Sequence, residues 1–118
     1  MNPEEAIVVL CAVPQDFEAE ALARALLESS LAACVQVSPG VTSIYRWKGA
    51  ISKGEERLLL IKTRRDLFER VAAVICSKHP YDVPEIVAWP LCEAHAPYLA
   101  WIAAETAPAS SPGSTTSR

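Results

Sequence analysis

The sequence lacks a strong charge of either sign and any long hydrophobic run, and these absences exclude several classes of protein. Its 118 residues include 11 basic and 14 acidic side chains, a formal net charge of −3. This balance offers no basic surface to nucleic acid or to an anionic membrane, so neither is an expected partner. No stretch approaches the roughly 20 apolar residues that a membrane-spanning helix needs.

The first residues also lack the positively charged start of a secretory signal. Residues 1–5 contain two glutamates and no Lys or Arg, and the apolar run that follows ends at Pro14. Such a short, acidic start is not typical of an exported protein. We therefore expect a cytoplasmic protein.

Cofactor-binding motifs are absent too. The four cysteines are widely spaced, with no C-x-x-C pair and no histidine at zinc-site spacing; they are Cys11, Cys34, Cys76 and Cys92. Structural zinc is therefore not expected. No G-x-x-x-x-G-K-[ST] motif is present, and we predict no organic cofactor.

What the sequence does contain is strands that are apolar on both faces. Residues 7–13 and 58–61 are continuous apolar runs, which a strand with one water-facing side would not show. The two clear helices between the strands can cover one face of a small sheet. We predict that the other face meets another copy of the chain, which suits the hydrophobic content of 51%.

The order of predicted elements indicates an α+β fold. The first half has a strand at 6–13, a helix capped by Asp16, and an extended stretch at 31–37 that resumes at 41–48 as one long or bent strand. A turn region between Gly49 and Gly54 leads to a strand at 56–63 and then to a helix capped by Asp66 and ended by His79-Pro80. A strand at 85–89 and a helix at 98–105, begun by Pro97, complete the order. This is the ferredoxin-like βαββαβ order with an extra C-terminal helix. We expect one domain over residues 1–106 and a disordered tail at 107–118.

In this topology the first and third strands are central neighbours, and the second lies at an edge. That edge strand carries Tyr45 and Trp47. Exposed aromatic side chains on an unpaired edge invite association. We therefore predict that this strand forms the contact between subunits.

Four segments carry a resemblance to a known family. They are LAACV at 31–35, PGVTSIYRWKG at 39–49, IKT at 61–63 and HPYDVPEI at 79–86. With these segments in order, residues 6–102 resemble the CutA divalent-cation-tolerance family. The resemblance implies a homotrimer of ferredoxin-like subunits, similar in architecture to PII signalling proteins. It also implies a link to tolerance of copper and other divalent metal ions, and no established enzymatic reaction.

A metal site is the first functional hypothesis. Cys11 and His79 match positions that the family offers as metal contacts, and thiolate with imidazole suits copper. Glu85 is the candidate for a harder third ligand. On the alternative interpretation, Cys11 is a core residue, and His79, which precedes a proline, is a capping or surface residue.

A ligand cleft between subunits is the second hypothesis. Lys62 shares a strand face with leucines, where an unpaired charge is costly, so we expect Glu85 beside it. This pair is either an ion pair that stabilises a subunit interface or part of a cleft formed by Trp47, Lys62, Tyr81 and Glu85. Such a cleft would take a small anionic ligand or a metal chelate.

The sequence therefore favours a homotrimeric protein that binds copper or another divalent metal ion in the response to metal ions. A PII-like signalling or scaffold protein with a small anionic ligand is the alternative. An enzyme built from Ser43, Tyr45 and His79 lacks any nucleophile-elbow or other catalytic spacing, so we do not expect catalysis.

Overall fold

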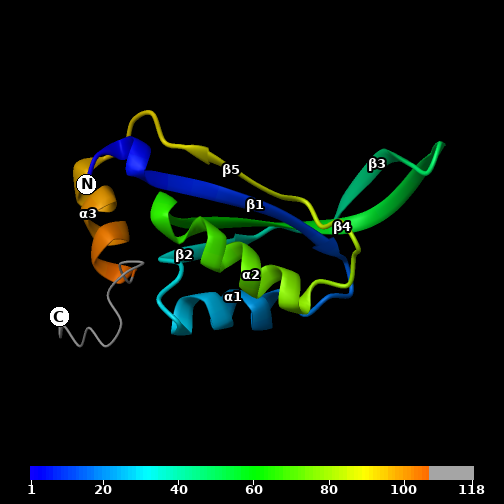
Figure 1. Ribbon diagram of the computed structural model, residues 1–118, viewed down its shortest axis with the longest axis horizontal. Coiled ribbons are helices and arrows are strands. Elements are labelled where there is room, and N and C mark those ends of the chain that lie inside the picture. The colour runs from blue at the N-terminus through cyan, green and yellow to red at the C-terminus, as the bar shows by residue number, and fades with distance from the viewer. Residues whose placement is uncertain (107–118) are drawn as a thin grey trace.

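Two strands, β1 (Ala6–Pro14) and β4 (Ala50–Arg64), lie side by side at the centre of one antiparallel sheet (Figure 1). The computed structural model describes residues 1–106, so the tail expected at 107–118 lies outside the described residues. The other elements are α1 (Ala19–Glu28), β2 (Cys34–Val37), β3 (Val41–Trp47), α2 (Phe68–Lys78), β5 (Ile86–Pro90) and α3 (Ala96–Glu105), with short 3-10 turns at Pro3–Glu5 and Arg65–Leu67. The predicted α+β, ferredoxin-like order and its extra C-terminal helix are confirmed.

The sheet runs in the order β2-β4-β1-β5, and β3 pairs with the outer part of β4. The register places Val9 opposite Ile61 and Leu10 opposite Leu60, so the two apolar runs meet residue by residue. The prediction that these strands are central neighbours is therefore correct. None of the helices in residues 1–106 has the length and apolar character needed to cross a bilayer.

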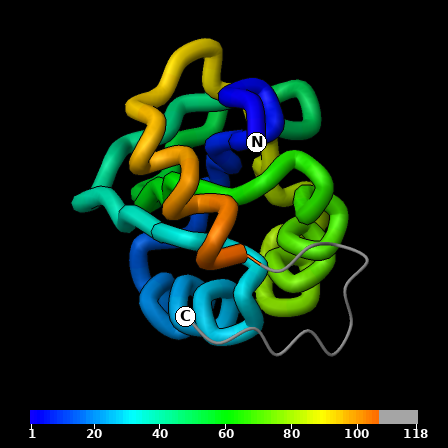
Figure 2. The backbone as a smooth tube through the Cα atoms, turned by 90° about the vertical axis from the view of Figure 1, so that its left-hand side faces the viewer, coloured from blue at the N-terminus to red at the C-terminus, as the bar shows by residue number. Residues whose placement is uncertain are grey.

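One face of the sheet is covered by α1 and α2, which lie side by side (Figure 2). α1 turns an apolar stripe toward the sheet, in which Leu22 and Leu26 are fully inaccessible. The sheet meets it with alternate residues of β1, which follows from the two-residue period of a strand. These are Val9, Cys11 and Val13. The main hydrophobic core lies between these layers.

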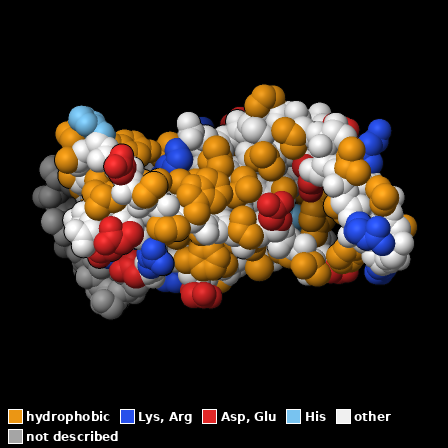
Figure 3. Space-filling view, turned by 90° about the horizontal axis from the view of Figure 1, so that it is seen from above, with side chains coloured by type: hydrophobic (Ala, Val, Ile, Leu, Met, Phe, Trp, Pro, Cys, Tyr) orange, Lys and Arg blue, Asp and Glu red, His pale blue; other side chains and the backbone are white. Residues whose placement is uncertain are grey.

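The opposite face of the sheet is only partly covered by the described chain. Leu99 and Ile102 of α3 pack on Ala6 and Ala33 near one end. Farther along, Val87 and Trp89 of β5 are 47% and 44% exposed. Figure 3 shows hydrophobic side chains spread across the molecule when it is seen from above, the side away from α1 and α2 in Figure 1. That a second copy covers this face stays a prediction.

The extended stretch at 31–48 is two strands rather than one long or bent strand. The break comes at residues 38–40, where Pro39 has no N–H to donate. Ser38 holds the chain beside β4 at this point: its N–H donates to the Leu58 carbonyl, and its Oγ accepts the Leu58 N–H, both at 2.8 Å. β2 and β3 therefore pair with different parts of β4.

The β3–β4 hairpin projects beyond the rest of the sheet (Figure 1). Its two turn residues, Lys48 and Gly49, have φ angles of 51° and 81°, as a tight type I′ hairpin turn requires. Gly54 lies inside β4 opposite Ser43, so the turn region expected up to Gly54 was placed too far along the chain. β4 begins six residues earlier than the sequence predicts because this short turn lets pairing start at once.

Both predicted helix caps are wrong. Asp16 lies in a turn closed by the Phe17 N–H on the Pro14 carbonyl, and α1 begins only at Ala19. Asp66 lies in the 3-10 turn before α2 and pairs instead with Arg64, at 2.7 Å. The guanidinium is a charged donor, so it outcompetes a backbone N–H for this carboxylate. By contrast, His79 ends α2 and Pro97 lies in the first turn of α3, as predicted.

Candidate functional site

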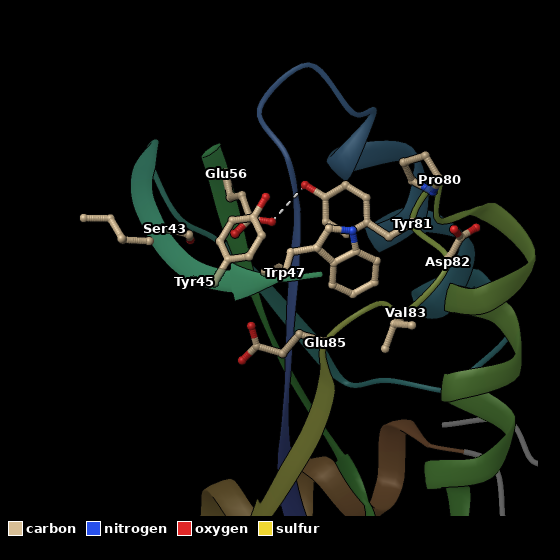
Figure 4. Close-up of a pocket in the computed structure, with 11 residues that line it drawn as sticks. Ser43, Tyr45, Trp47, Glu56, Pro80, Tyr81, Asp82, Val83 and Glu85 are labelled. Atoms are coloured by element: carbon tan, nitrogen blue, oxygen red, sulfur yellow. Dashed lines mark hydrogen bonds between the residues drawn. The ribbon is translucent and has the colours of Figure 1, made fainter. Parts of the chain in front are cut away.

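A cavity of about 670 Å³ lies where the hairpin leaves the sheet (Figure 4). Three aromatic side chains and three carboxylates line it together with smaller residues: Tyr45, Trp47, Tyr81, Glu56, Asp82 and Glu85. No Lys or Arg is among the lining residues. A space of this size can hold a small-molecule ligand.

Strand alternation places the hairpin residues of the cavity. Tyr45 and Trp47 are two residues apart on β3, so they share the face that Ser43 also presents to the cavity. Glu56 of β4 opposes both Val41 of β3 and Pro14 of β1. It therefore stands at the junction between the hairpin and the sheet, where its side chain is only 8% exposed.

Tyr81 holds the far wall of the cavity in place. Its hydroxyl donates to Glu56 Oε2 at 2.9 Å, and its backbone N–H donates to His79 Nδ1 at 3.2 Å. Its ring also lies 4.7 Å from that of His79, centroid to centroid. Desolvation, then the bond to Glu56, raises the pKa of Tyr81 to about 12. The hydroxyl therefore stays a donor throughout the physiological pH range.

His79 is bound on both sides of its ring. Its Nε2 lies 2.7 Å from the Ala12 carbonyl oxygen, which can only accept, so Nε2 carries the hydrogen of this bond. Nδ1 accepts from the Tyr81 N–H, and the ring stacks on Phe17 at 6.0 Å. Neither nitrogen is free to ligate a metal ion or to act as a base for Ser43. His79 is thus a structural residue in this arrangement.

Cys11 is a core residue. It is fully buried among Val9, Val13 and the helices. Burial, followed by the negative charge of Glu85, raises the pKa of its thiol to about 12. A raised pKa disfavours the thiolate, which is the form that metals bind. Within residues 1–106, no three His, Cys, Asp or Glu side chains are grouped to hold a metal ion, so Cys11, His79 and Glu85 are not brought together as one site.

Three of the four residues predicted for a cleft do line the cavity, namely Trp47, Tyr81 and Glu85, whereas Lys62 does not. Lys62 lies opposite Val8, while Glu85 precedes Ile86, which lies opposite Cys11, so the two are offset along the sheet. Lys62 Nζ donates to Gln36 Oε1 at 2.5 Å, at an exposed position. The Gln36 amide oxygen takes the place of the expected carboxylate, and no ion pair with Glu85 forms within residues 1–106.

Sequence reasoning missed the carboxylates of Glu56 and Asp82 and the ring of Tyr45 as parts of one site. Asp82 directly follows Tyr81, which was a signal that could have been used. Glu56 could have been found only with the correct hairpin register, since its pairing with Val41 places it on the face of Tyr45 and Trp47.

Comparison with known proteins identifies the family. The sequence model of the CutA1 divalent ion tolerance protein matches residues 7–105. The chain is 46% identical over 99 residues to the divalent-cation tolerance protein CutA of Thermus thermophilus, covering 84% of this chain and 96% of that protein. It belongs to the CutA1 family. The chloroplastic CutA of Arabidopsis thaliana is 40% identical over 96 residues, which are 81% of this chain and about half (53%) of that relative.

Solved CutA1 structures have the same fold. The Thermus thermophilus structure has a TM-score of 0.83 at 45% identity and covers 86% of this chain and 99% of that one. The Oryza sativa structure also has a TM-score of 0.83, at 37% identity, with 86% and 94% covered. The family is named for tolerance of divalent ions.

The Tyr81–Glu56 hydrogen bond predicts an unusual alkaline titration. Because the folded-state pKa of Tyr81 is raised from 10.0 to about 12, its contribution to stability is complete below pH 10 and is lost as the pH rises toward 12. Glu56→Gln keeps an acceptor oxygen but removes the charge, so Tyr81 should ionise at lower pH. Ultraviolet absorbance titration measures this, with Tyr81→Phe to assign the late step. An unchanged late step in Glu56→Gln would contradict the assignment.

Proposed function

We propose that the chain is a homotrimeric, cytoplasmic protein that binds divalent metal ions in the response to metal ions, with the carboxylate-lined cavity as the cation site. The observation that carries this proposal is the presence of Glu56, Asp82 and Glu85 in a cavity with no lining Lys or Arg. A wall with this charge attracts cations and repels anions. The alternative of a small anionic ligand loses support because Lys62 lies outside the cavity.

The ligand chemistry follows from what is available in the cavity. Glu85 is exposed and stays the expected ligand, with Glu56 and Asp82 as further oxygen donors. Because three such side chains are not grouped within residues 1–106, we propose that the ion keeps part of its water shell and binds loosely. Among divalent ions, Cu²⁺ should bind more tightly than Zn²⁺ by the Irving–Williams order. Cys11 and His79 take no part.

The trimer is proposed on the apolar surface that the chain leaves open. The outer face of the hairpin carries Ile44 and Ile51, which are 70% and 72% exposed. Tyr45 and Trp47 lie on its inner face and line the cavity, which Ile44 also borders. We propose that the contact predicted for this strand is made by the outer face of the same hairpin. The half-covered face of the sheet, with Val87 and Trp89, adds further apolar area.

Ile51→Asp should break the trimer. A carboxylate at this position would be desolvated against a partner subunit, and the cross-strand Arg46 would offset only part of that cost. Native mass spectrometry of the full chain should show trimer for the parent protein and monomer or aggregate for the variant. The matched control is Leu27→Asp, which places the same charge at an apolar residue 40% exposed on α1, and this variant should remain trimeric. A trimeric Ile51→Asp protein would mean that the outer hairpin face is not an interface.

Metal binding should depend on the cavity and not on the buried thiol. Glu85→Gln should weaken Cu²⁺ binding about tenfold, because it removes one charged oxygen ligand. Cys11→Ser should leave it unchanged. Isothermal titration calorimetry of the trimer with Cu²⁺ and Zn²⁺ measures both.

The paired variants separate the two metal sites considered. Loss of Cu²⁺ binding in Cys11→Ser, with Glu85→Gln unaffected, would return the site to the thiol and His79. Equal binding in all three proteins would exclude both sets of residues.

A further inference from the structure

The walls of the cavity combine two kinds of group that recognise organic cations. Tyr45, Trp47 and Tyr81 present aromatic side chains, and Glu56, Asp82 and Glu85 present carboxylates (Figure 4). Aromatic faces attract ammonium groups through the ring quadrupole, most strongly in tryptophan. They also pack against methylene groups, which a hydrated metal ion cannot offer.

The negative charge of the cavity is not balanced by the protein. In the part of the chain that the structure describes, Glu56, Asp82 and Glu85 form no ion pair, and the salt bridge present there joins Arg64 and Asp66. Glu56 is more than nine-tenths buried, and the hydrogen-bond donor it has is the neutral hydroxyl of Tyr81. A buried carboxylate without a cation is costly, and a cationic ligand would remove that cost.

An ammonium group already lies near one of these rings. Lys48 Nζ is 5.9 Å from the centroid of the Trp47 ring, at the outer limit of a cation–π contact. Lys48 belongs to the hairpin turn and does not line the cavity. Trp47 itself is 44% exposed and lines the cavity, so its indole is accessible to an alkylammonium group.

The three carboxylates come from two segments and surround the space rather than converge. Glu56 belongs to β4, whereas Asp82 and Glu85 both belong to the loop between α2 and β5. Figure 4 shows the three on different sides, with aromatic rings between them. They are not grouped to hold one metal ion. A ligand that contacts all three needs several positive charges separated by an apolar chain.

We propose that the cavity binds an aliphatic polyamine. Its ammonium groups donate to Glu56, Asp82 and Glu85, and its methylene segments pack on Trp47 and the two tyrosines. This ligand class goes beyond the metal ions of the proposed function. It uses the aromatic walls, which metal binding leaves without a role.

The test is calorimetric titration of the full-length protein, freed of metal by dialysis against a chelator, with spermidine. Putrescine, tetramethylammonium and Mg²⁺ are compared at the same ionic strength. Spermidine should bind about tenfold more tightly than putrescine, because it makes one more charge-assisted hydrogen bond. Tetramethylammonium, which has no N–H, and Mg²⁺ should bind more weakly than either amine.

Three variants locate the site. Glu85→Gln, at an exposed position, should raise the Kd for spermidine about tenfold, and Trp47→Leu should raise it about fivefold. Glu55→Gln is the matched control, because it removes the same charge from the residue next to Glu56. The Glu55 side chain lies on the outer hairpin face, where it accepts a hydrogen bond from Thr42. This control should change the Kd by less than about twofold.

Several results would overturn the proposal. They are absence of spermidine binding at millimolar concentration, an equal effect of Glu55→Gln and Glu85→Gln, or binding of Mg²⁺ or tetramethylammonium as tight as that of spermidine. Because the protein is metal-free in this titration, failure of the proposed metal function leaves the result interpretable. Retained Cu²⁺ binding without spermidine binding would refute the polyamine site alone.

Discussion

Strand β4 belongs both to the core of the sheet and to the projecting hairpin, and the rest of the molecule depends on this double pairing. Its 15 residues pair with β1 and β2 along the core and with β3 along the projecting hairpin. The change of partner is possible because Pro39 interrupts the neighbouring strand, while Ser38, just before the break, bonds to both the N–H and the carbonyl of Leu58. Glu56 lies at this junction, so the continuity of one strand places a buried carboxylate beside a cavity.

A short chain of contacts ties the cavity to the core. Glu56 accepts from Tyr81, Tyr81 donates its N–H to His79, and His79 is bound to the Ala12 carbonyl of β1. The loop after α2 is thereby held against the hairpin. This arrangement explains why His79 serves structure, while the open carboxylates of Asp82 and Glu85 remain available for cations. A ligand bound to Glu56 would compete directly with the hydrogen bond from the Tyr81 hydroxyl.

The sequence predicted the parts of the fold that periodicity controls. The continuous apolar runs of β1 and β4 were recognisable because burial alone decides them. The site was harder to predict because the register between paired strands decides which of its residues lie close together. The type I′ turn at Lys48 and Gly49 determines which side of the hairpin faces the cavity, and the offset between Lys62 and Glu85 keeps them apart. Local motifs do not encode either feature.

We propose that cations bind at the carboxylate-lined cavity and not at the buried Cys11 and His79. Anomalous X-ray diffraction from crystals of the full chain soaked with Cu²⁺ tests it most directly, because the metal is located independently of any variant. We expect an anomalous peak inside the cavity beside Glu85. A peak at the Cys11 sulfur and the His79 ring, with an empty cavity, would contradict it.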